Sequence, residues 1–157
     1  TIHHYGEDSN RIVFFQEVAR VLKPGGKLVL NYTEPSQIPF YWPVSLVPLS
    51  SYKNSHNERT SEQYIEMAKA SLEYVEKQKV TEPFLKSEVY DNMAFLLDEK
   101  ATFCDSTFSY ASDEEKTLAR KIVQKCIDTN NFQYKETLDT FGKEYGFSSI
   151  LIWKKAQ

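Results

Sequence analysis

The chain has 157 residues, of which 41% are hydrophobic and 14% aromatic, so it is long enough for one domain with a substantial core. Its 19 basic and 22 acidic residues give a formal net charge of −3 and form no long block of one sign. This balance argues against a nucleic-acid-binding protein and favours a small-molecule ligand. The apolar runs are much shorter than the roughly 20 residues of a membrane-spanning helix, so we expect no membrane partner.

The few candidate metal ligands lack the spacing of a metal site. Cys104 and Cys126 are far apart in the sequence, and the adjacent side chains of His3 and His4 diverge on an extended segment. We therefore predict no metal. The two cysteines, together with the lack of a leader-like segment, predict a reducing, cytoplasmic setting. Residues Thr1 to His4 are typical of a strand end, so we expect the natural domain to begin further upstream.

Residues 1–33 predict a strand-helix-strand unit. After the strand end, a helix capped by Asp8, Ser9 or Asn10 is expected to extend to Leu22. Its apolar positions recur at three- and four-residue spacing: Phe14, Phe15, Val18, Val21 and Leu22. Residues Pro24-Gly25-Gly26 end the helix, and the apolar run 27–32 is typical of a strand covered on both faces in a parallel sheet.

The next two segments differ in regularity. Residues 34–59 are interrupted by Pro35, Pro39, Pro43 and Pro48, so we expect an apolar loop that covers part of the domain. Residues 60–80 then predict a second helix followed by a strand, because Thr60 and Gln63 form a capping-box pattern and 73–80 can be extended.

The remaining sequence predicts a helical insertion and a closing pair of strands. The insertion, 81–133, contains a helix expected at 84–98 and another that begins at Ser112 with Glu115 three residues later. Residues 134–157 then predict closing strands, with 146–153 paired to 134–141 through a glycine-containing loop.

Three stretches carry a resemblance to one known family. The first is Ile2-His3-His4 followed by a helix with Phe15 and Glu17-Val18-Ala19-Arg20 and by Val21-Leu22-Lys23-Pro24-Gly25-Gly26-Lys27-Leu28; the others are 64–75 and the strand before Lys154-Lys155. They are similar to the second half of class I, Rossmann-like S-adenosylmethionine-dependent methyltransferases. The resemblance implies an α/β fold: the second half of a doubly wound, mostly parallel sheet, with an antiparallel last strand and a helical insertion.

The sequence departs from that family in two ways. These 157 residues contain no glycine-rich loop after an early strand and no acidic residue placed to hold the ribose, so the resemblance implies that this chain supplies the acceptor side of the cleft. Residues 81–141 are long where many relatives have a short connection, and we interpret them as a cap over the substrate.

The resemblance also implies a reaction and a site. The reaction is methyl transfer from S-adenosylmethionine to a small-molecule acceptor, in which the protein mainly positions the reactants. The expected residues are His4 and Tyr32 for catalysis, His3 and Tyr5 for cofactor binding, and Asn31, Tyr41 and Trp42 for acceptor binding. A backbone-bonded role for His4 and core packing of the aromatic residues remain alternatives.

Two other functions compete with a small-molecule methyltransferase. One is a non-catalytic, methyltransferase-like partner protein that lacks the cofactor loop. The other is a transfer-RNA methyltransferase, because Ile2-His3-His4 also occurs in such relatives, although the absence of a basic patch counts against it. A homodimer is compatible with the sequence in either case.

Overall fold

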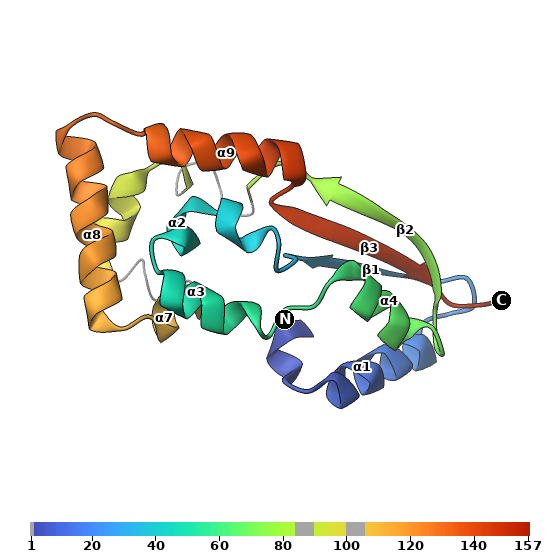
Figure 1. Cartoon of the computed structure of the whole chain (residues 1–157). Coiled ribbons are helices and arrows are strands. Elements are labelled where there is room, and N and C mark those ends of the chain that lie inside the picture. Colours follow the sequence, from blue (N-terminus) through green and yellow to red (C-terminus); the bar gives the residue numbers. More distant parts are fainter. Residues whose placement is uncertain (1, 84–89, 100–105) are drawn as a thin grey trace.

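The computed structural model describes residues 2–83, 90–99 and 106–157 (Figure 1). The chain is a mixed α/β protein with a three-stranded sheet and two helices at one end and a group of helices at the other (Figure 1). None of the helices in these residues is long and apolar enough to cross a membrane.

The sheet has the order β1-β3-β2. Strand β3 (Ser148–Lys154) pairs antiparallel with β1 (Lys27–Tyr32) on one side and with β2 (Glu73–Val80) on the other, so β1 and β2 run in the same direction. The predicted antiparallel last strand is confirmed. No two strands of the described residues pair in parallel, so the mostly parallel sheet is not shown.

The predicted strand at the start of the chain is wrong for the described residues. Ile2–Tyr5 form a short 3-10 helix, η1, and Gly6 with φ 69° leads into α1 (Asp8–Val21). Side chains of α1 take up the backbone carbonyls of η1: Asn10 Nδ2 donates to Tyr5 O at 3.0 Å and Arg11 Nη2 to His3 O at 3.5 Å. Helix α1 itself is confirmed, although its cap is Glu7 rather than a later residue.

Helices α1 and α4 (Ser61–Ala68) belong with the sheet to one hydrophobic core, which includes the fully buried Phe15, Tyr64, Leu151 and Trp153. The capping box that Thr60 and Gln63 predicted at α4 is confirmed. The expectation that 27–32 is covered on both faces is wrong, because Leu30 and Tyr32 are buried whereas the alternate residues Val29 and Asn31 are exposed.

The proline-rich segment is more regular than predicted. It forms η2 (Ile38–Phe40), α2 (Trp42–Ser45) and α3 (Pro48–Ser55), each with a proline in its first two positions. Proline fits there because the first N–H groups of a helix have no acceptor within the helix. The prolines therefore start short helices instead of preventing them.

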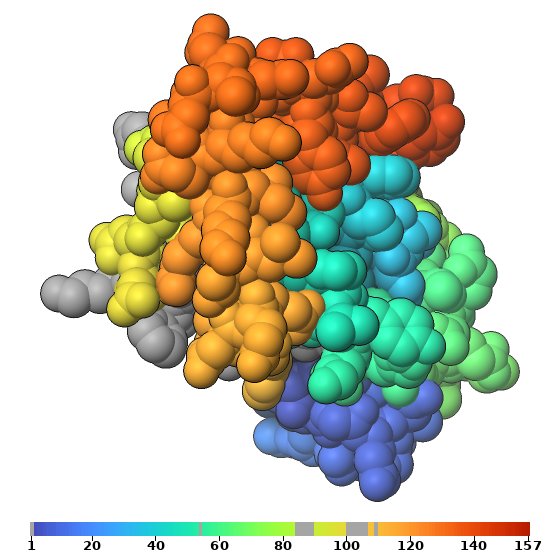
Figure 2. Space-filling model, turned by 60° about the vertical axis from the view of Figure 1, so that its left-hand side comes forward, coloured from blue at the N-terminus to red at the C-terminus, as the bar shows by residue number. Residues whose placement is uncertain are grey.

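The helical end contains η3 (Met93–Leu97), α7 (Ser106–Tyr110), α8 (Asp113–Asp128) and α9 (Gln133–Tyr145). Figure 2 shows α8 (orange) between η3 (yellow) and the segment with α2 and α3 (cyan to green). These elements share a second core with the fully or almost fully buried Trp42, Tyr90, Phe108, Val123 and Phe147. The capping box at Ser112 is confirmed.

Two secondary-structure predictions in this part are corrected. Residues 84–89 of the predicted helix 84–98 lie outside the described residues, and the remainder is interrupted before Asn92, whose side chain caps η3. Residues 134–141, predicted as a strand, belong to α9. The Thr137 and Thr140 hydroxyls bond the carbonyls four residues earlier, which is compatible with a helix.

The junction of α9 and β3 yields a stability prediction. A Cβ on Gly142 would lie 2.1 Å from Phe147 Cζ, so Gly142→Ala forces the buried ring to move. We expect this variant to lower the free energy of unfolding by about 1–3 kcal/mol, against the roughly 1 kcal/mol gain usual for such a change in a helix. Denaturation in urea measures it.

The neighbouring exposed residue provides the control. Lys143→Ala should change the unfolding free energy by less than about 0.5 kcal/mol. In a Phe147→Leu background the cost of Gly142→Ala should shrink, because the obstructing ring is gone. Equal costs in both backgrounds contradict the packing argument.

Candidate functional site

Polar side chains gather at the carboxyl ends of β1 and β2. These ends lie on the same side of the sheet because the two strands run in one direction. Glu34 follows β1, and its Oε1 atom lies at the centre of the group. Tyr32 OH donates to it at 3.0 Å and Ser149 Oγ at 3.3 Å, with Ser61 Oγ and Lys77 Nζ also in contact. We call these five residues the Glu34 cluster.

Glu34 is ionised in this cluster. Burial by itself would raise the pKa of its carboxyl group, but the hydrogen bonds from Lys77, Ser61 and Tyr32, together with the charge of Lys77, hold the pKa below its ordinary value. Burial raises the pKa of the Tyr32 phenol, and the adjacent Glu34 carboxylate raises it further. Tyr32 therefore stays protonated and donates to Glu34, so in this state it positions the carboxylate and does not act as a base.

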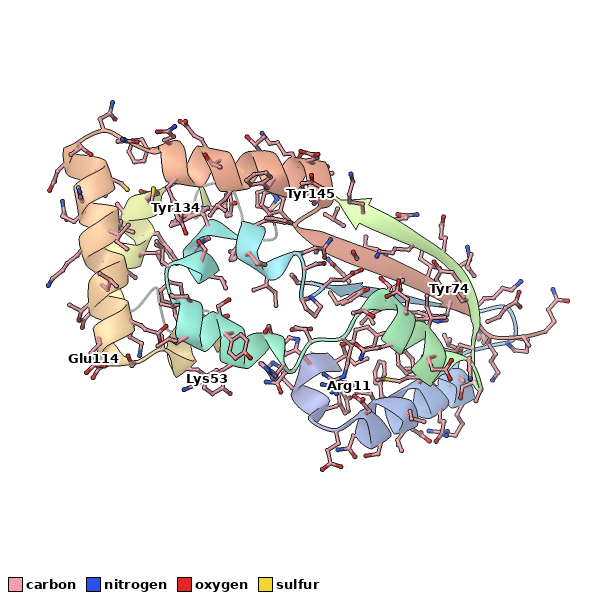
Figure 3. All side chains as sticks on the ribbon, viewed as in Figure 1. Arg11, Lys53, Tyr74, Glu114, Tyr134 and Tyr145 are labelled. Carbon is pink, nitrogen blue, oxygen red and sulfur yellow. The ribbon has the colours of Figure 1, made fainter. Side chains whose placement is uncertain are left out.

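A cavity of about 360 Å³ adjoins the Glu34 cluster. Its polar lining includes Glu34, Lys77 and Lys79, and Phe40 and Tyr145 contribute aromatic rings that stack with their centroids 5.7 Å apart. Figure 3 shows Tyr145 at the end of α9, close to the end of β2. A cavity with an apolar wall and a few charged groups is typical of small-molecule sites.

A second polar group lies on the other side of the start of α4, and we call it the Arg11 cluster: His3, Asp8, Arg11, Glu58 and Arg59. His3 Nδ1 lies 3.2 Å from Glu58 Oε1. The fully buried Arg11 donates to Asp8 Oδ1 at 2.7 Å and to the Asn57 carbonyl at 2.8 Å, so it ties η1 and α1 to the segment before α4 (Figure 3). Arg59 Nε donates to the same Asp8 oxygen at 2.8 Å.

Burial shifts the pKa values of Glu58 and His3 so that the uncharged form of each side chain is favoured. It raises the pKa of the Glu58 carboxyl from 4.5 to about 7, against the lowering effect of the nearby Arg11 and Arg59. Burial, assisted by neighbouring positive charge, lowers the pKa of His3 from 6.5 to about 4. A neutral imidazole thus faces a carboxyl group that titrates near pH 7.

The predicted site residues are distributed over three places. His3, His4 and Tyr5 lie together on η1, where the rings of His3 and His4 are tilted against each other with centroids 4.1 Å apart and Tyr5 is 45% exposed. Tyr32 lies in the Glu34 cluster, whereas Asn31, the residue before it on the strand, is on the opposite face of the sheet.

Tyr41 and Trp42 lie in neither cluster. Trp42 is fully buried in the helical core and donates its indole N–H to the Tyr90 carbonyl at 3.0 Å, while Tyr41 packs against Tyr90 with centroids 5.4 Å apart. The structure therefore shows these two residues in the packing role that the sequence left open. A contact of Trp42 with an acceptor would require that core to rearrange.

The sequence did not indicate Glu34, Ser61, Lys77, Glu58 or Arg11. One signal could have identified Glu34: it is a charged residue two positions after Tyr32, the end of a predicted strand. No local signal identified Lys77 or Glu58, which come close to their partners only in the folded chain. Within the described residues no group of three or more His, Cys, Asp or Glu residues could hold a metal ion.

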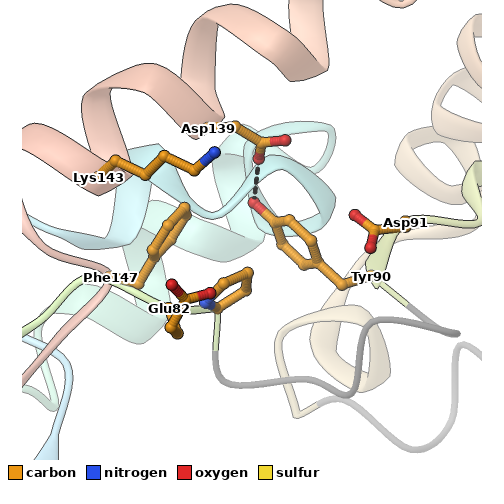
Figure 4. Close-up of a pocket in the computed structure, with 7 residues that line it drawn as sticks. Glu82, Tyr90, Asp91, Asp139, Lys143 and Phe147 are labelled. Carbon is orange, nitrogen blue, oxygen red and sulfur yellow. Dashed lines mark hydrogen bonds between the residues drawn. The ribbon is translucent and has the colours of Figure 1, made fainter.

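A smaller cavity of about 280 Å³ lies under α9 (Figure 4). Tyr90 OH donates to Asp139 Oδ1 at 2.6 Å, and Lys135 Nζ donates to Asp139 Oδ2 at 2.6 Å. Both oxygens of Asp139 thus have donors from the protein, and Lys135 also lies 4.9 Å from the centre of the Tyr90 ring. These bonds indicate that the group stabilises the junction between α9 and the segment around Tyr90.

The chain was compared with known families, curated proteins and solved structures. No family model matches it, and no curated protein or solved structure is significantly similar to it.

The Glu34 cluster yields a second prediction. Glu34→Gln removes the carboxylate that accepts from Lys77, so we expect the free energy of unfolding at pH 7 to fall by about 1–3 kcal/mol. Because the pKa of Glu34 is lower in the folded than in the unfolded state, its contribution is complete above pH 4.5 and is lost as the pH falls below that. Urea denaturation at pH 7 and pH 3 measures both effects.

The exposed ion pair of Glu66 and Lys69 offers a matched control. Glu66→Gln should change the unfolding free energy by less than about 0.5 kcal/mol. If Glu34→Gln is equally mild at pH 7, the Glu34 cluster does not stabilise the fold.

The Arg11 cluster yields a third prediction, on pH. Because the pKa of Glu58 is higher in the folded than in the unfolded state, its ionisation destabilises the fold increasingly between pH 4.5 and 7. Glu58→Gln should therefore become increasingly more stable than the wild type between pH 4.5 and 7. Above pH 7 the difference in the free energy of unfolding should stay constant at roughly 1–3 kcal/mol. The lowered pKa of His3 has the opposite effect, because it makes the fold more stable as the pH rises from 4 to 6.5. His3 is present in both proteins, so its contribution drops out of the difference between them. A stability difference that does not change with pH contradicts the raised pKa of Glu58.

Proposed function

We propose that this chain forms the acceptor side of an S-adenosylmethionine-dependent methyltransferase that acts on a small molecule. The observation that carries the proposal is the order of the sheet, in which β3 lies antiparallel between β1 and β2. Strands β1 and β2 run in the same direction, and each follows a helix of the same hydrophobic core. The resemblance of 2–30 and 64–75 implies the same helix-to-strand steps and the same antiparallel last strand.

The two edges of the sheet support a continuation beyond β1. Strand β2 has charged side chains such as Glu73, Glu76 and Lys79, which protect an edge from further pairing. Strand β1 instead exposes 59% of Val29, and half of its backbone N–H and C=O groups point away from β3. We infer that further strands of a doubly wound sheet pair with β1 in the whole protein.

The described residues fit the outer rim of a cofactor site. S-adenosylmethionine supplies a methyl group on a positively charged sulfur, so the protein mainly has to align donor and acceptor. The exposed ring of Tyr5 offers an aromatic face for that charge. It packs against Phe14 with the ring centroids 5.4 Å apart, and the neighbouring His4 is exposed. Other residues of the protein would hold the ribose and the methionine group.

A non-catalytic partner protein is the second candidate. The exposed Val29 favours it, as does the edge of β1 that pairs with no other strand of the described residues, because both can equally contact another chain. Cofactor binding separates the two candidates.

Calorimetric titration of S-adenosylmethionine into the full-length protein tests the proposal. We expect saturable binding that Tyr5→Ala weakens by about two- to fivefold, which is the size of an exposed cation–π contact. Tyr110→Ala removes a similarly exposed ring on α7 and should leave the affinity unchanged. Absence of binding to the full-length wild type refutes the methyltransferase and favours the partner protein.

A further inference from the structure

The cavity between η2, β2 and the end of α9 combines cationic and aromatic walls. Lys77 and Lys79 lie two residues apart on β2, so their side chains share one face of the strand. Lys77 is paired with Glu34. Lys79 Nζ donates to the backbone carbonyl of Glu144 at 2.7 Å, and no ion pair in the described part of the chain includes it. The charged lining therefore carries one positive charge more than negative.

The position of Lys79 is fixed by the α9–β3 junction. Gly146 has φ 96°, and a Cβ there would lie 2.7 Å from Lys79 Cγ and 2.9 Å from Gln37 Nε2. Only a glycine allows the Lys79 stem and the buried Gln37 amide to approach the backbone this closely. The ammonium group is thus held at the cavity with a neutral oxygen as its partner, which leaves its charge available to an anion.

Another part of the cavity lining is aromatic. Phe40 stacks on Tyr145 at 5.7 Å and lies 5.9 Å from Phe141, and Tyr145 is 54% exposed. A planar ring can lie against these rings, since offset stacking of aromatic groups is favourable. The volume of about 360 Å³ is at the small end of ligand pockets, which suits a single substituted ring.

We propose that this cavity binds an aromatic carboxylate, with the ring against Phe40 and Tyr145 and the carboxylate on Lys79. Its role as the methyl acceptor rests on the proposed function, whereas the binding itself does not. Glu34 in the cavity lining also accepts a hydrogen bond from Ser61 at the start of α4.

Titration of the full-length protein with 4-hydroxybenzoate, followed by nuclear magnetic resonance, tests the proposal. We expect saturable binding, and about tenfold weaker binding of 4-hydroxybenzyl alcohol, which keeps the ring and loses the charge. Lys79→Met should weaken the binding of 4-hydroxybenzoate about tenfold. Lys53→Met changes an exposed side chain on α3 and should leave the binding unchanged. No binding, or equal binding by Lys79→Met, overturns the site.

A second variant tests the aromatic wall. Phe40→Leu should weaken 4-hydroxybenzoate severalfold and leave cyclohexanecarboxylate unchanged, because only the planar ring stacks. Equal losses for both ligands overturn the stacking geometry. Unfolding midpoints of all variants show whether each is folded under the conditions of the titration.

The two proposals fail separately. If the wild type binds S-adenosylmethionine and not 4-hydroxybenzoate, the carboxylate site is wrong and the methyltransferase stands. If it binds 4-hydroxybenzoate and not S-adenosylmethionine, the site stands and its role as methyl acceptor is wrong.

Discussion

The Glu34 carboxylate connects the sheet to the helix that covers it. Its Oε1 atom is contacted by Tyr32 from β1, Lys77 from β2, Ser149 from β3 and Ser61 from α4. A buried charge is costly unless hydrogen bonds and an opposite charge compensate for it, so this arrangement requires all four elements in place at once. The order of the strands and the position of α4 are thus coupled through one oxygen.

The connection between α9 and β3 joins the two halves of the protein. Phe147, just before β3, packs in the helical core, and Leu151 and Trp153 of β3 pack in the sheet core. Gly142 makes room for the Phe147 ring, and Gly146 takes a backbone conformation that other residues rarely adopt. The larger of the two cavities described above lies at this junction, so its shape depends on both cores.

The site residues differ in what they can do chemically. Tyr32 is buried and protonated, so it orients Glu34, while the exposed His4 and Tyr5 are accessible to a ligand. Arg11 bonds to backbone on both sides of the His3–Glu58 pair and so holds it in position. In the proposed methyltransferase, the protein would mainly align the reactants and would need few residues that exchange protons.

Caps and periodicity in the sequence by themselves determined α1, α4 and α8, and apolar runs determined β1 and β3, because these signals act within a few residues. They failed at η1, where Arg11 and Asn10 bond the carbonyls, and at α9, where the sequence predicts a strand at 134–141. Only the tertiary structure decided the site. Glu34 lies 43 residues from Lys77 and 115 from Ser149 in the sequence, and Lys79 acquires its place from Gly146. Such contacts arise from the order of the strands, which a local pattern does not contain.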